Sequence, residues 1–312
     1  MSFTLYWLQA GGCGGDSMSL LSSECPDLVE AGTRMDIKIL KHPSFSAEPV
    51  AQQRQTLAAL LAGDLQLDFL CLEGALVRGP NGTGFYDRMG NQSKKDVFKT
   101  LALRARFVLA VGTCASFGGI GAGLEIDACG AQFLHDKKGG VLGADFTTPS
   151  GYPVINLPGC PCHNEVILGT MALLISGQTV LLNEFNAPSA WYEMLIHQGC
   201  TRNEYHEYRV EDTQFGEKGC LFFHLGCHGP LAYGPCNKLL WNRRSSKTRV
   251  GVPCFGCTRP DFPQPYPFFQ TRNIEGIPIQ LPDGVDRAHY LAYKGMAAAA
   301  APIRLIQRKN RV

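Results

Sequence analysis

The first half of the chain alternates short apolar runs with segments of helical pattern. The predicted strands are residues 4–9, 35–40, 67–72, 107–112 and 154–157, and the predicted helices are residues 17–29, 52–62, 94–104 and 166–175. This alternation predicts an α/β fold with a doubly wound parallel sheet. It also constrains where a site can form, because ligands of such sheets bind in the crevice beyond the carboxyl ends of the strands.

Three of the predicted strands run into a cysteine within a few residues. These are Cys13 in GGCGGD, Cys114 in GTC and Cys160 in GCP, and a fourth strand ends at Glu73. Asp16 stands three residues after Cys13, where a Cys-x-x-Cys pair would be completed. Because the strand ends meet at one edge of the sheet, these residues are expected to form a single site.

The second half of the chain has a different character. From about residue 183 the segments become short, rich in loops, and dense in cysteine and aromatic residues. We therefore expect two domains, residues 1–182 and residues 183–312, with metal clusters stabilising the second, which has little regular structure of its own. The end of the chain, MAAAAAPIRLIQRKNRV, is expected to be an alanine-rich helix with a basic tail.

The composition excludes several classes of protein. The chain has 312 residues, 13 cysteines and a net charge of +2, which gives no case for nucleic-acid binding. No apolar run reaches the roughly 18 residues of a membrane span, and the N-terminus shows no signal peptide. We expect a cytoplasmic protein, or one bound peripherally to the cytoplasmic side of a membrane. Cytosolic thiols stay reduced, so clustered cysteines indicate metal binding.

Two further groups of potential metal ligands lie in the second half. One is His197 and Cys200, spaced as His-x-x-Cys, with Cys220 and Cys227, and the other is Cys236 with the pair Cys254 and Cys257. Thiolates bind iron–sulfur clusters or zinc. The wide spread of single cysteines favours several clusters, and zinc remains the competing interpretation because zinc sites use paired motifs at short range. The other cysteines, Cys25, Cys71, Cys129 and Cys162, are expected to be small apolar core residues.

Seven segments in a fixed order carry a resemblance to a known family. They are GGCGGDSMSLL, EGALVRGPNGTG, AVGTCASFGGI, VINLPGCPCH, HQGCTRNEY, GCLFFHLGCHGP and VPCFGCTRPDF, within residues 4–265. Together they resemble the small, electron-transferring subunit of NiFe hydrogenases, and the chain is more similar to the cytoplasmic branch than to the exported one. The resemblance implies a flavodoxin-like domain in residues 1–182 and a loop-rich iron–sulfur domain in residues 183–312.

The resemblance also implies three iron–sulfur clusters. The proximal cluster would bind Cys13, Cys114, Cys160 and, at the position of the family's usual fourth cysteine, Asp16; the distal cluster would bind His197, Cys200, Cys220 and Cys227; the medial cluster would bind Cys236, Cys254 and Cys257. Three ligands imply a 3Fe-4S medial cluster, since no fourth cysteine stands between the first two, and the distal cluster is expected to be 4Fe-4S. No FMN is expected, because the proximal cluster would occupy the crevice of a flavodoxin's flavin.

The same resemblance implies the partners and the function. The nickel–iron centre lies in a large subunit, so this chain contributes no catalytic residue and forms an obligate heterodimer, which associates into a higher oligomer. The leading hypothesis is oxidation of dihydrogen by an uptake enzyme under aerobic conditions, with electrons passing to a quinone or cytochrome. The alternatives are a dihydrogen-sensing regulatory hydrogenase, in which a fourth medial cysteine is common, and a zinc-binding scaffold protein.

Asp16 leaves the type of proximal cluster open. Its carboxylate either binds the fourth iron of a 4Fe-4S cluster or leaves a 3Fe-4S cluster, and both outcomes should raise the reduction potential because a carboxylate is a harder donor than a thiolate. Alternatively, Asp16 caps a helix that begins at Ser17. Oxygen-tolerant exported relatives add two cysteines where Gly15 and Gly119 stand here, so Asp16 is our candidate for any oxygen tolerance. Glu73 is expected to hydrogen-bond cluster ligands, or else to cap a helix or lie at the surface.

Overall fold

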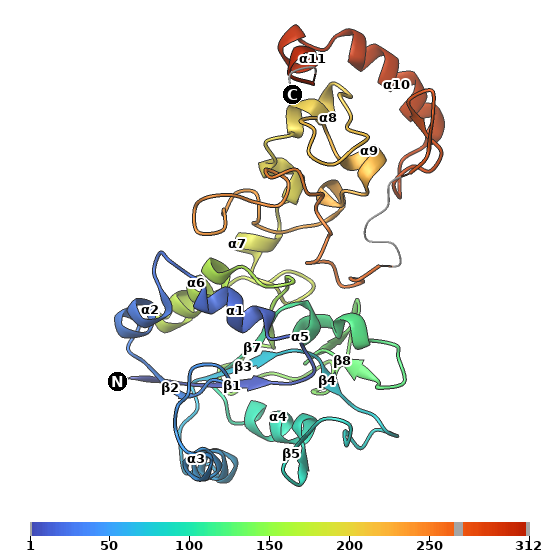
Figure 1. Cartoon of the computed structure of the whole chain (residues 1–312). Helices are drawn as coiled ribbons and strands as arrows, with labels where there is room; N and C mark the ends of the chain where they lie inside the picture. Colours follow the sequence, from blue (N-terminus) through green and yellow to red (C-terminus); the bar gives the residue numbers. More distant parts are fainter. Residues whose placement is uncertain (1, 265–270, 310–312) are drawn as a thin grey trace. The chain divides into compact units, whose positions relative to one another are not determined.

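The computed structural model describes residues 2–264 and 271–309 and divides into two compact units. The first unit is Met1–Trp191 with Thr258–Pro263, and the second is Tyr192–Cys257 with Gln264–Val312. The centre of the first unit is a sheet (Figure 1) that consists of β1 (Phe3–Gln9), β2 (Ile37–Lys41), β3 (Phe69–Glu73), β7 (Phe107–Val111) and β11 (Ile155–Leu157). All five predicted strands form, which confirms the α/β fold class.

The strands lie in the order β11-β7-β3-β1-β2, and each neighbouring pair is parallel. This is the order 2-1-3-4-5 of flavodoxin-like folds, whose switch point lies between β1 and β3. The central strands β3 and β7 are completely buried, as their continuous apolar sequences predict. The edge strand β2 carries the exposed Lys38, a charge that discourages pairing with a further strand.

Helices cover both faces of this sheet. They are α1 (Gly15–Leu21), α2 (Leu28–Arg34), α3 (Val50–Ala62), α4 (Lys94–Ala102), α5 (Thr113–Phe117) and α6 (Asn164–Ile175). Figure 1 shows α3 and α4 on one face and α1, α2 and α6 on the other. The helix α4 buries Val97, Phe98 and Leu101, and Ser93 caps its start, where the Ser93 hydroxyl accepts a hydrogen bond from the Asp96 amide.

One predicted helix is wrong in its extent. The structure divides residues 17–29 between α1 and α2, which are separated by residues 22–27. Pro26 lies in this gap, where its ring and its missing N–H prevent a continuous helix. Asp27 then starts α2 by accepting a hydrogen bond from the Glu30 amide at 2.8 Å.

Short elements complete the first unit. They are the strand pairs β4 (Leu76–Val77) with β8 (Ala128–Cys129), β5 (Arg88–Met89) with β6 (Gln92–Ser93), and β9 (Phe133–Leu134) with β10 (Lys137–Lys138), the 3-10 helix η1 (Gly119–Gly121), and α7 (Ser189–Tyr192), whose last residue belongs to the second unit. They extend the connections beyond the carboxyl ends of the central strands.

The second unit is built mostly from loops and short helices. Its elements are η2 (Ile196–Gly199), α8 (Asn203–Glu207), α9 (Phe222–Leu225), η3 (Gly229–Leu231), the pair β12 (Asn273–Ile274) and β13 (Ile277–Pro278), α10 (Arg287–Ala299) and α11 (Ile303–Lys309). Its largest group of buried apolar side chains is small and mostly aromatic: Tyr205, Cys220, Phe222, Phe223, Tyr290 and Leu305.

The predicted tail helix is found as α10 and α11, which are interrupted before Ile303 by Pro302. Asp286 caps the start of α10, because its carboxylate accepts a hydrogen bond from the His289 amide at 2.9 Å. The last three residues of the predicted basic tail lie outside the described residues. Within the described ranges, no helix has both the length and the hydropathy that crossing a membrane requires.

Candidate metal centres

The loops that follow β1, β3, β7 and β11 are joined by backbone hydrogen bonds at one edge of the sheet. The Ala10 amide donates to the Glu73 carbonyl at 2.8 Å, and the amide of Thr113 donates to the carbonyl of Gly159 at 2.9 Å. The hydroxyl of Thr113 also accepts a hydrogen bond from the Gly159 amide at 2.9 Å. These bonds fix the loops that carry the three predicted proximal cysteines at one edge, as the strand pattern implies.

The proximal side chains differ in exposure. Cys13 and Cys160 are exposed, and Cys114 is half-buried. Burial raises the pKa of Cys114, and the nearby carboxylate of Asp16 and the thiol of Cys13 raise it further. Cys13, Asp16 and Cys114 are therefore close enough to interact electrostatically, while Cys160 lies two residues before the amide that binds Asp16.

Asp16 is not the helix cap that one interpretation predicted. The helix α1 begins at Gly15, and its N-cap residue is Gly14, in the left-handed conformation, which has no side chain that could accept a cap hydrogen bond. Asp16 is 9% exposed, and its Oδ1 accepts a hydrogen bond from the Cys162 amide at 2.7 Å. A methyl group at Gly112, where φ is +87°, would lie 2.1 Å from Oδ2 of Asp16, so only glycine leaves room for this carboxylate.

The environment of Asp16 suits a bound cation. Burial raises its pKa to about 7, and although the Cys162 hydrogen bond lowers the pKa, the charge of Glu73 raises it again. A buried carboxylate without a positive partner is unfavourable, because charge is costly to remove from water. An iron bound by Asp16 and the adjoining thiolates would supply that positive partner, so the donor set fits a cluster.

The positions of Gly15 and Gly119 adjoin the proximal thiols. A Cβ atom at Gly119 would lie 2.5 Å from the Sγ of Cys114, and one at Gly15 would lie 3.2 Å from the Sγ of Cys13. Side chains added at these two positions would therefore meet the predicted ligands directly. This placement agrees with the correspondence drawn from the sequence.

Glu73 supports α1 from the end of β3. Its carboxylate is buried and accepts hydrogen bonds from Nε1 of Trp7 at 2.9 Å, from the Ser17 amide at 2.8 Å and from the Ser17 hydroxyl at 2.5 Å. The Ser17 amide belongs to the first turn of α1, so the expectation of a helix cap is confirmed and that of a surface carboxylate is wrong. Glu73 thereby holds the helix that carries Asp16.

Replacing Glu73 by glutamine should lower the stability of the chain by about 1–3 kcal/mol, since an amide NH₂ would face a buried N–H donor that cannot reverse. Thermal unfolding followed by circular dichroism measures this loss. Glu125→Gln, at an exposed position, is the matched control and should leave the midpoint unchanged. Equal midpoints for the two variants would show that the three hydrogen bonds to Glu73 do not stabilise α1.

The predicted distal ligands come together in the second unit. Cys220 is buried, which raises its pKa, and the neighbouring thiols of Cys227 and Cys200 add to this effect. His197 lies in η2, and its Nε2 is buried without a hydrogen-bond partner among the described residues. An orphaned imidazole nitrogen in the same residue set as these thiols is a suitable ligand for iron.

The predicted medial ligands form a neighbouring group. Burial raises the pKa of Cys236 to about 12, with a further contribution from Cys257, and Cys254 is raised by burial and by both Cys227 and Cys257. The amide of Cys254 donates to the Sγ of Cys227 at 3.3 Å. The medial and distal groups therefore adjoin at the contact between Cys254 and Cys227.

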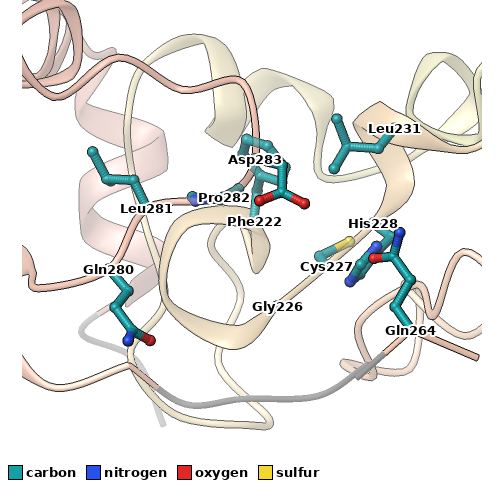
Figure 2. Close-up of a pocket in the computed structure, with 10 residues that line it drawn as sticks. All are labelled: Phe222, Gly226, Cys227, His228, Leu231, Gln264, Gln280, Leu281, Pro282 and Asp283. Atoms are coloured by element: carbon teal, nitrogen blue, oxygen red, sulfur yellow. The ribbon is translucent and has the colours of Figure 1, made fainter. Parts of the chain in front are cut away.

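A cavity of about 570 Å³ opens beside this contact (Figure 2). Cys227 and His228 lie on its wall, and Figure 2 shows Gln280 and Asp283 from the segment before α10 on the same cavity. Cys227 thus lies on the wall of a cavity of mixed polar and apolar lining, as well as next to its neighbouring thiols.

Backbone donors point at several of these sulfur atoms. The amides of Arg202 and Phe222 approach the Sγ atoms of Cys200 and Cys220 at 3.3 and 3.5 Å, and the Gly256 amide approaches that of Cys254 at 3.5 Å. Such hydrogen bonds stabilise a thiolate and set the potential of a bound cluster. Buried thiols with raised pKa values need a metal to become thiolates, so this donor set also fits iron–sulfur clusters.

Arg202 braces the loops that carry the distal cysteines. Its guanidinium donates to the carbonyls of Thr248 at 2.7 Å, Glu217 at 2.8 Å and Gly219 at 2.6 Å. The side chain therefore ties the backbone next to Cys200 to the backbone next to Cys220. Such a brace fixes the ligands where regular secondary structure is scarce.

Sequence reasoning missed one residue near the distal group and misplaced another. His206 belongs to none of the predicted ligand groups, but its Nδ1 lies 3.4 Å from the Sγ of Cys220 and its ring centroid lies 4.5 Å from that of His197. Its spacing from His197 matches no ligand motif, so only the structure could reveal it.

Cys25 is exposed, which makes its expected core position wrong, whereas the core positions of the other three, Cys71, Cys129 and Cys162, are confirmed.

Among the residues that the structure describes, no three His, Cys, Asp or Glu side chains gather closely enough to hold a single metal ion. The arrangement is compatible with clusters, in which each ligand binds a separate iron atom.

Two protein-family models match the chain. The model for the C-terminal region of the NiFe/NiFeSe hydrogenase small subunit matches residues 192–270, and the model for the 20 Kd subunit of NADH ubiquinone oxidoreductase matches residues 13–174. The first match covers the distal and medial groups, and the second covers the strand-end region.

Curated relatives are similar along most of the chain. The F420 non-reducing hydrogenase I small subunit of Methanosarcina mazei is 29% identical over 335 aligned positions, which cover 98% of this chain and 84% of that protein. The Hydrogenase-2 small chain of Escherichia coli is 30% identical over 264 positions, which cover 80% of this chain and 65% of that protein. Other relatives are named as periplasmic, so the cytoplasmic location stays a prediction.

Solved structures share the fold. The actinobacterial-type NiFe-hydrogenase from Ralstonia eutropha H16 superimposes with a TM-score of 0.80 at 25% identity, covering 99% of this chain and 89% of that chain. The recombinant NiFeSe hydrogenase from Desulfovibrio vulgaris Hildenborough gives 0.72 at 29% identity, covering 87% and 98%. The hydrogenase small-subunit model matches residues 192–270, and the hydrogenase small subunits of Methanosarcina mazei and Escherichia coli are similar over 98% and 80% of this chain, so the chain belongs to the family of NiFe hydrogenase small subunits, whose catalytic site lies in the partner large subunit.

Proposed function

We propose that the chain is the electron-transfer small subunit of an uptake hydrogenase that oxidises dihydrogen under aerobic conditions. The large subunit would form an obligate heterodimer with it, heterodimers would associate further, and a quinone or cytochrome would accept the electrons. The observation that carries this proposal is the gathering of three donor sets: one at the strand ends of the first unit, and two that adjoin at Cys227 and Cys254 in the second.

The candidate ligands form three sets, and each set would hold one iron–sulfur cluster. When bound, each cluster would accept and pass on one electron at a time. Residues 1–182 would hold the proximal cluster, either 4Fe-4S with a carboxylate ligand or 3Fe-4S, and residues 183–312 would hold a medial 3Fe-4S and a distal 4Fe-4S cluster. The ligands are Cys13, Asp16, Cys114 and Cys160; Cys236, Cys254 and Cys257; and His197, Cys200, Cys220 and Cys227. The protein's own task is to hold these groups apart, exclude water and direct N–H donors at the sulfurs.

The edge that carries the proximal set is suited to a protein partner. Large apolar side chains are exposed next to it: Met18 on α1, Ile120 in η1 and Leu124 in the following loop are 65%, 70% and 58% exposed. Apolar side chains gathered beside a functional site are typical of an interface with another protein. This supports contact between the large subunit and the proximal edge.

Purification of the chain with its large subunit tests the proposal. Iron and acid-labile sulfide should be present in amounts that correspond to three clusters, and the complex should oxidise dihydrogen rapidly with a redox dye. Very slow turnover would favour a dihydrogen sensor. A colourless complex without sulfide would contradict the proposal and return zinc to consideration.

A further inference from the structure

A groove of about 680 Å³ lies between α10 and the wall formed by α8 and α9. Aromatic side chains line both sides: Phe222 and Phe223 on one wall, Tyr290 and Tyr293 on the other. Tyr293 is 48% exposed, and Met296 at the same wall is 74% exposed. The groove thus offers flat apolar surfaces to a ligand that enters from solvent.

One cationic side chain is fixed between the two walls. The guanidinium carbon of Arg209 lies 4.7 Å from the ring centroid of Phe223 and 4.8 Å from that of Tyr293. It is further held by a hydrogen bond to the His206 carbonyl at 2.6 Å. A planar cation stacked between rings is a preorganised partner for an aromatic ligand that carries carbonyl oxygens.

His206 joins this groove to the distal group. Its ring lines the groove and stacks on Phe223 with an interplanar angle of 12°, while its Nδ1 lies 3.4 Å from the Sγ of Cys220. A single imidazole therefore contacts both a candidate cluster ligand and the groove. An electron acceptor in the groove would be separated from the distal ligands by one side chain.

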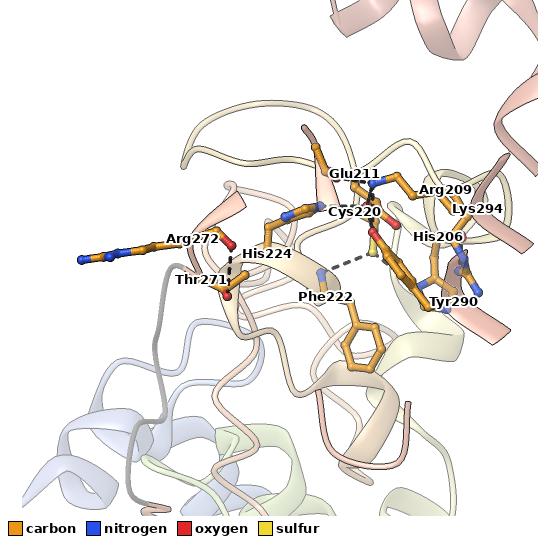
Figure 3. A network of polar contacts seen from close by, with 11 residues as sticks. His206, Arg209, Glu211, Cys220, Phe222, His224, Thr271, Arg272, Tyr290 and Lys294 are labelled. Atoms are coloured by element: carbon orange, nitrogen blue, oxygen red, sulfur yellow. Dashed lines mark hydrogen bonds and ion pairs between the residues drawn. The ribbon is translucent and has the colours of Figure 1, made fainter. Parts of the chain in front are cut away.

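The opposite wall carries a polar network that reaches solvent (Figure 3). The Tyr290 hydroxyl donates to Oε2 of Glu211 at 2.7 Å, and Nζ of Lys294 donates to the same oxygen at 3.0 Å and to the Tyr290 hydroxyl at 2.9 Å. The Nε2 of His224 lies 2.8 Å from that oxygen as well. Lys294 is one-quarter exposed, so the chain of donors connects water to a residue of the groove.

We propose that this groove binds a quinone, which accepts the electrons that leave the distal group. The inference rests on the proposed function and names its acceptor. Each quinone takes up two electrons from the oxidation of one dihydrogen molecule by the large subunit and two protons from solvent, so that both carbonyl groups become hydroxyl groups and a quinol leaves. The network of Tyr290, Lys294 and Glu211 lies where those protons are needed.

The chemistry of the groove favours a quinone over other small acceptors. Nicotinamide and flavin nucleotides carry phosphates, which the negative charge of Asp286 in the lining disfavours. The cavity beside Cys227 has Phe222 as its one aromatic hydrocarbon ring and no cation stacked between rings, so it offers a quinone fewer flat surfaces. The aromatic groove matches a flat apolar molecule with two polar ends.

The test uses the complete heterodimer and two substitutions at exposed positions, Tyr293→Ala and Met296→Glu. Equilibrium dialysis with decylubiquinone measures binding directly, and hydrogen-dependent reduction of decylubiquinone is compared with that of a redox dye. We expect each variant to bind decylubiquinone about tenfold more weakly and to lose about tenfold in the ratio of quinone to dye activity. Phe215→Ala, which removes an exposed aromatic side chain outside the groove, should change neither value.

The outcomes separate this inference from the proposed function. A wild-type complex that reduces the dye but neither binds nor reduces decylubiquinone would overturn the groove and leave the hydrogenase assignment intact. Reduction of a cytochrome without quinone binding would do the same. Failure of dye reduction would contradict the proposed function, while the binding measurement on the variants would still decide whether the groove holds a quinone.

Discussion

Replacement of Cys254 by serine should reduce hydrogen oxidation with an external acceptor at least about a hundredfold. Substitution of a residue that only supports a metal ligand already lowers metal affinity or activity by about 10–100-fold, and loss of the ligand itself should cost more. Cys254 is 7% exposed and lies among Cys227, Cys236 and Cys257, so it stands where the two groups of the second unit meet. A serine oxygen is a hard donor that stays protonated at neutral pH, and it binds iron far more weakly than a thiolate.

Iron content, the electron paramagnetic resonance of the medial cluster and dye-linked activity measure this effect in the purified heterodimer. Cys25→Ser is the matched control, since Cys25 is exposed and belongs to none of the three sets; it should retain full iron and activity. Gel filtration with the large subunit separates loss of a cluster from loss of the fold. An active Cys254→Ser complex with wild-type iron content would show that Cys254 is not a ligand.

Substitution of Asp16 by cysteine should lower the potential of the proximal cluster by roughly 100 mV, since thiolate stabilises the oxidised cluster more than a harder or neutral donor does. The variant completes a Cys-x-x-Cys pair with Cys13 and replaces a carboxylate that now lies against Gly112. If Asp16 also underlies oxygen tolerance, this variant should lose hydrogen oxidation faster in air than the wild type.

Asp16→Asn separates the ligand role from the hydrogen bond to the Cys162 amide. The amide oxygen can still accept that bond at its present position but is a poor ligand for iron, so one iron should be lost if Asp16 binds it. Asp36→Asn, at an exposed position with φ of +49° that asparagine adopts readily, is the control. Redox titration followed by spectroscopy measures the reduction potential of the proximal cluster and shows from its spectrum whether one iron is lost. Unchanged potential, spectrum and oxygen response in both Asp16 variants would remove this residue from the account.

Local signals were sufficient to predict the fold of the first unit. Its strands were found because β3 and β7 are continuous apolar runs, and burial on both faces of a parallel sheet demands such runs. The strand ends also located the proximal cysteines, since parallel strands leave the sheet at a shared edge. The extent of α1 was predicted less well, because the competition between helical pattern and Pro26 is settled by packing as well as by propensity.

The second unit offered far weaker signals. The residue types and spacings of Cys200, Cys220 and Cys254 indicated metal binding, but nothing in the sequence places Cys227 against Cys254, because that contact depends on how irregular loops fold back. His206 gave no signal at all: its contact with Cys220 arises between α8 and the loop before α9. Loops of this kind have no periodicity from which a neighbour can be deduced.

The sequence by itself determined which residue types stand at the ends of the parallel strands, because side-chain alternation and apolar runs fix a sheet locally. Only the tertiary structure decided what those residues do there: Asp16 became a buried carboxylate bound to the Cys162 amide instead of a helix cap, and Glu73 became the support of α1. The reason is that burial, which raises the pKa of Asp16 to about 7, depends on segments separated from it by more than a hundred residues, and no local pattern carries that information.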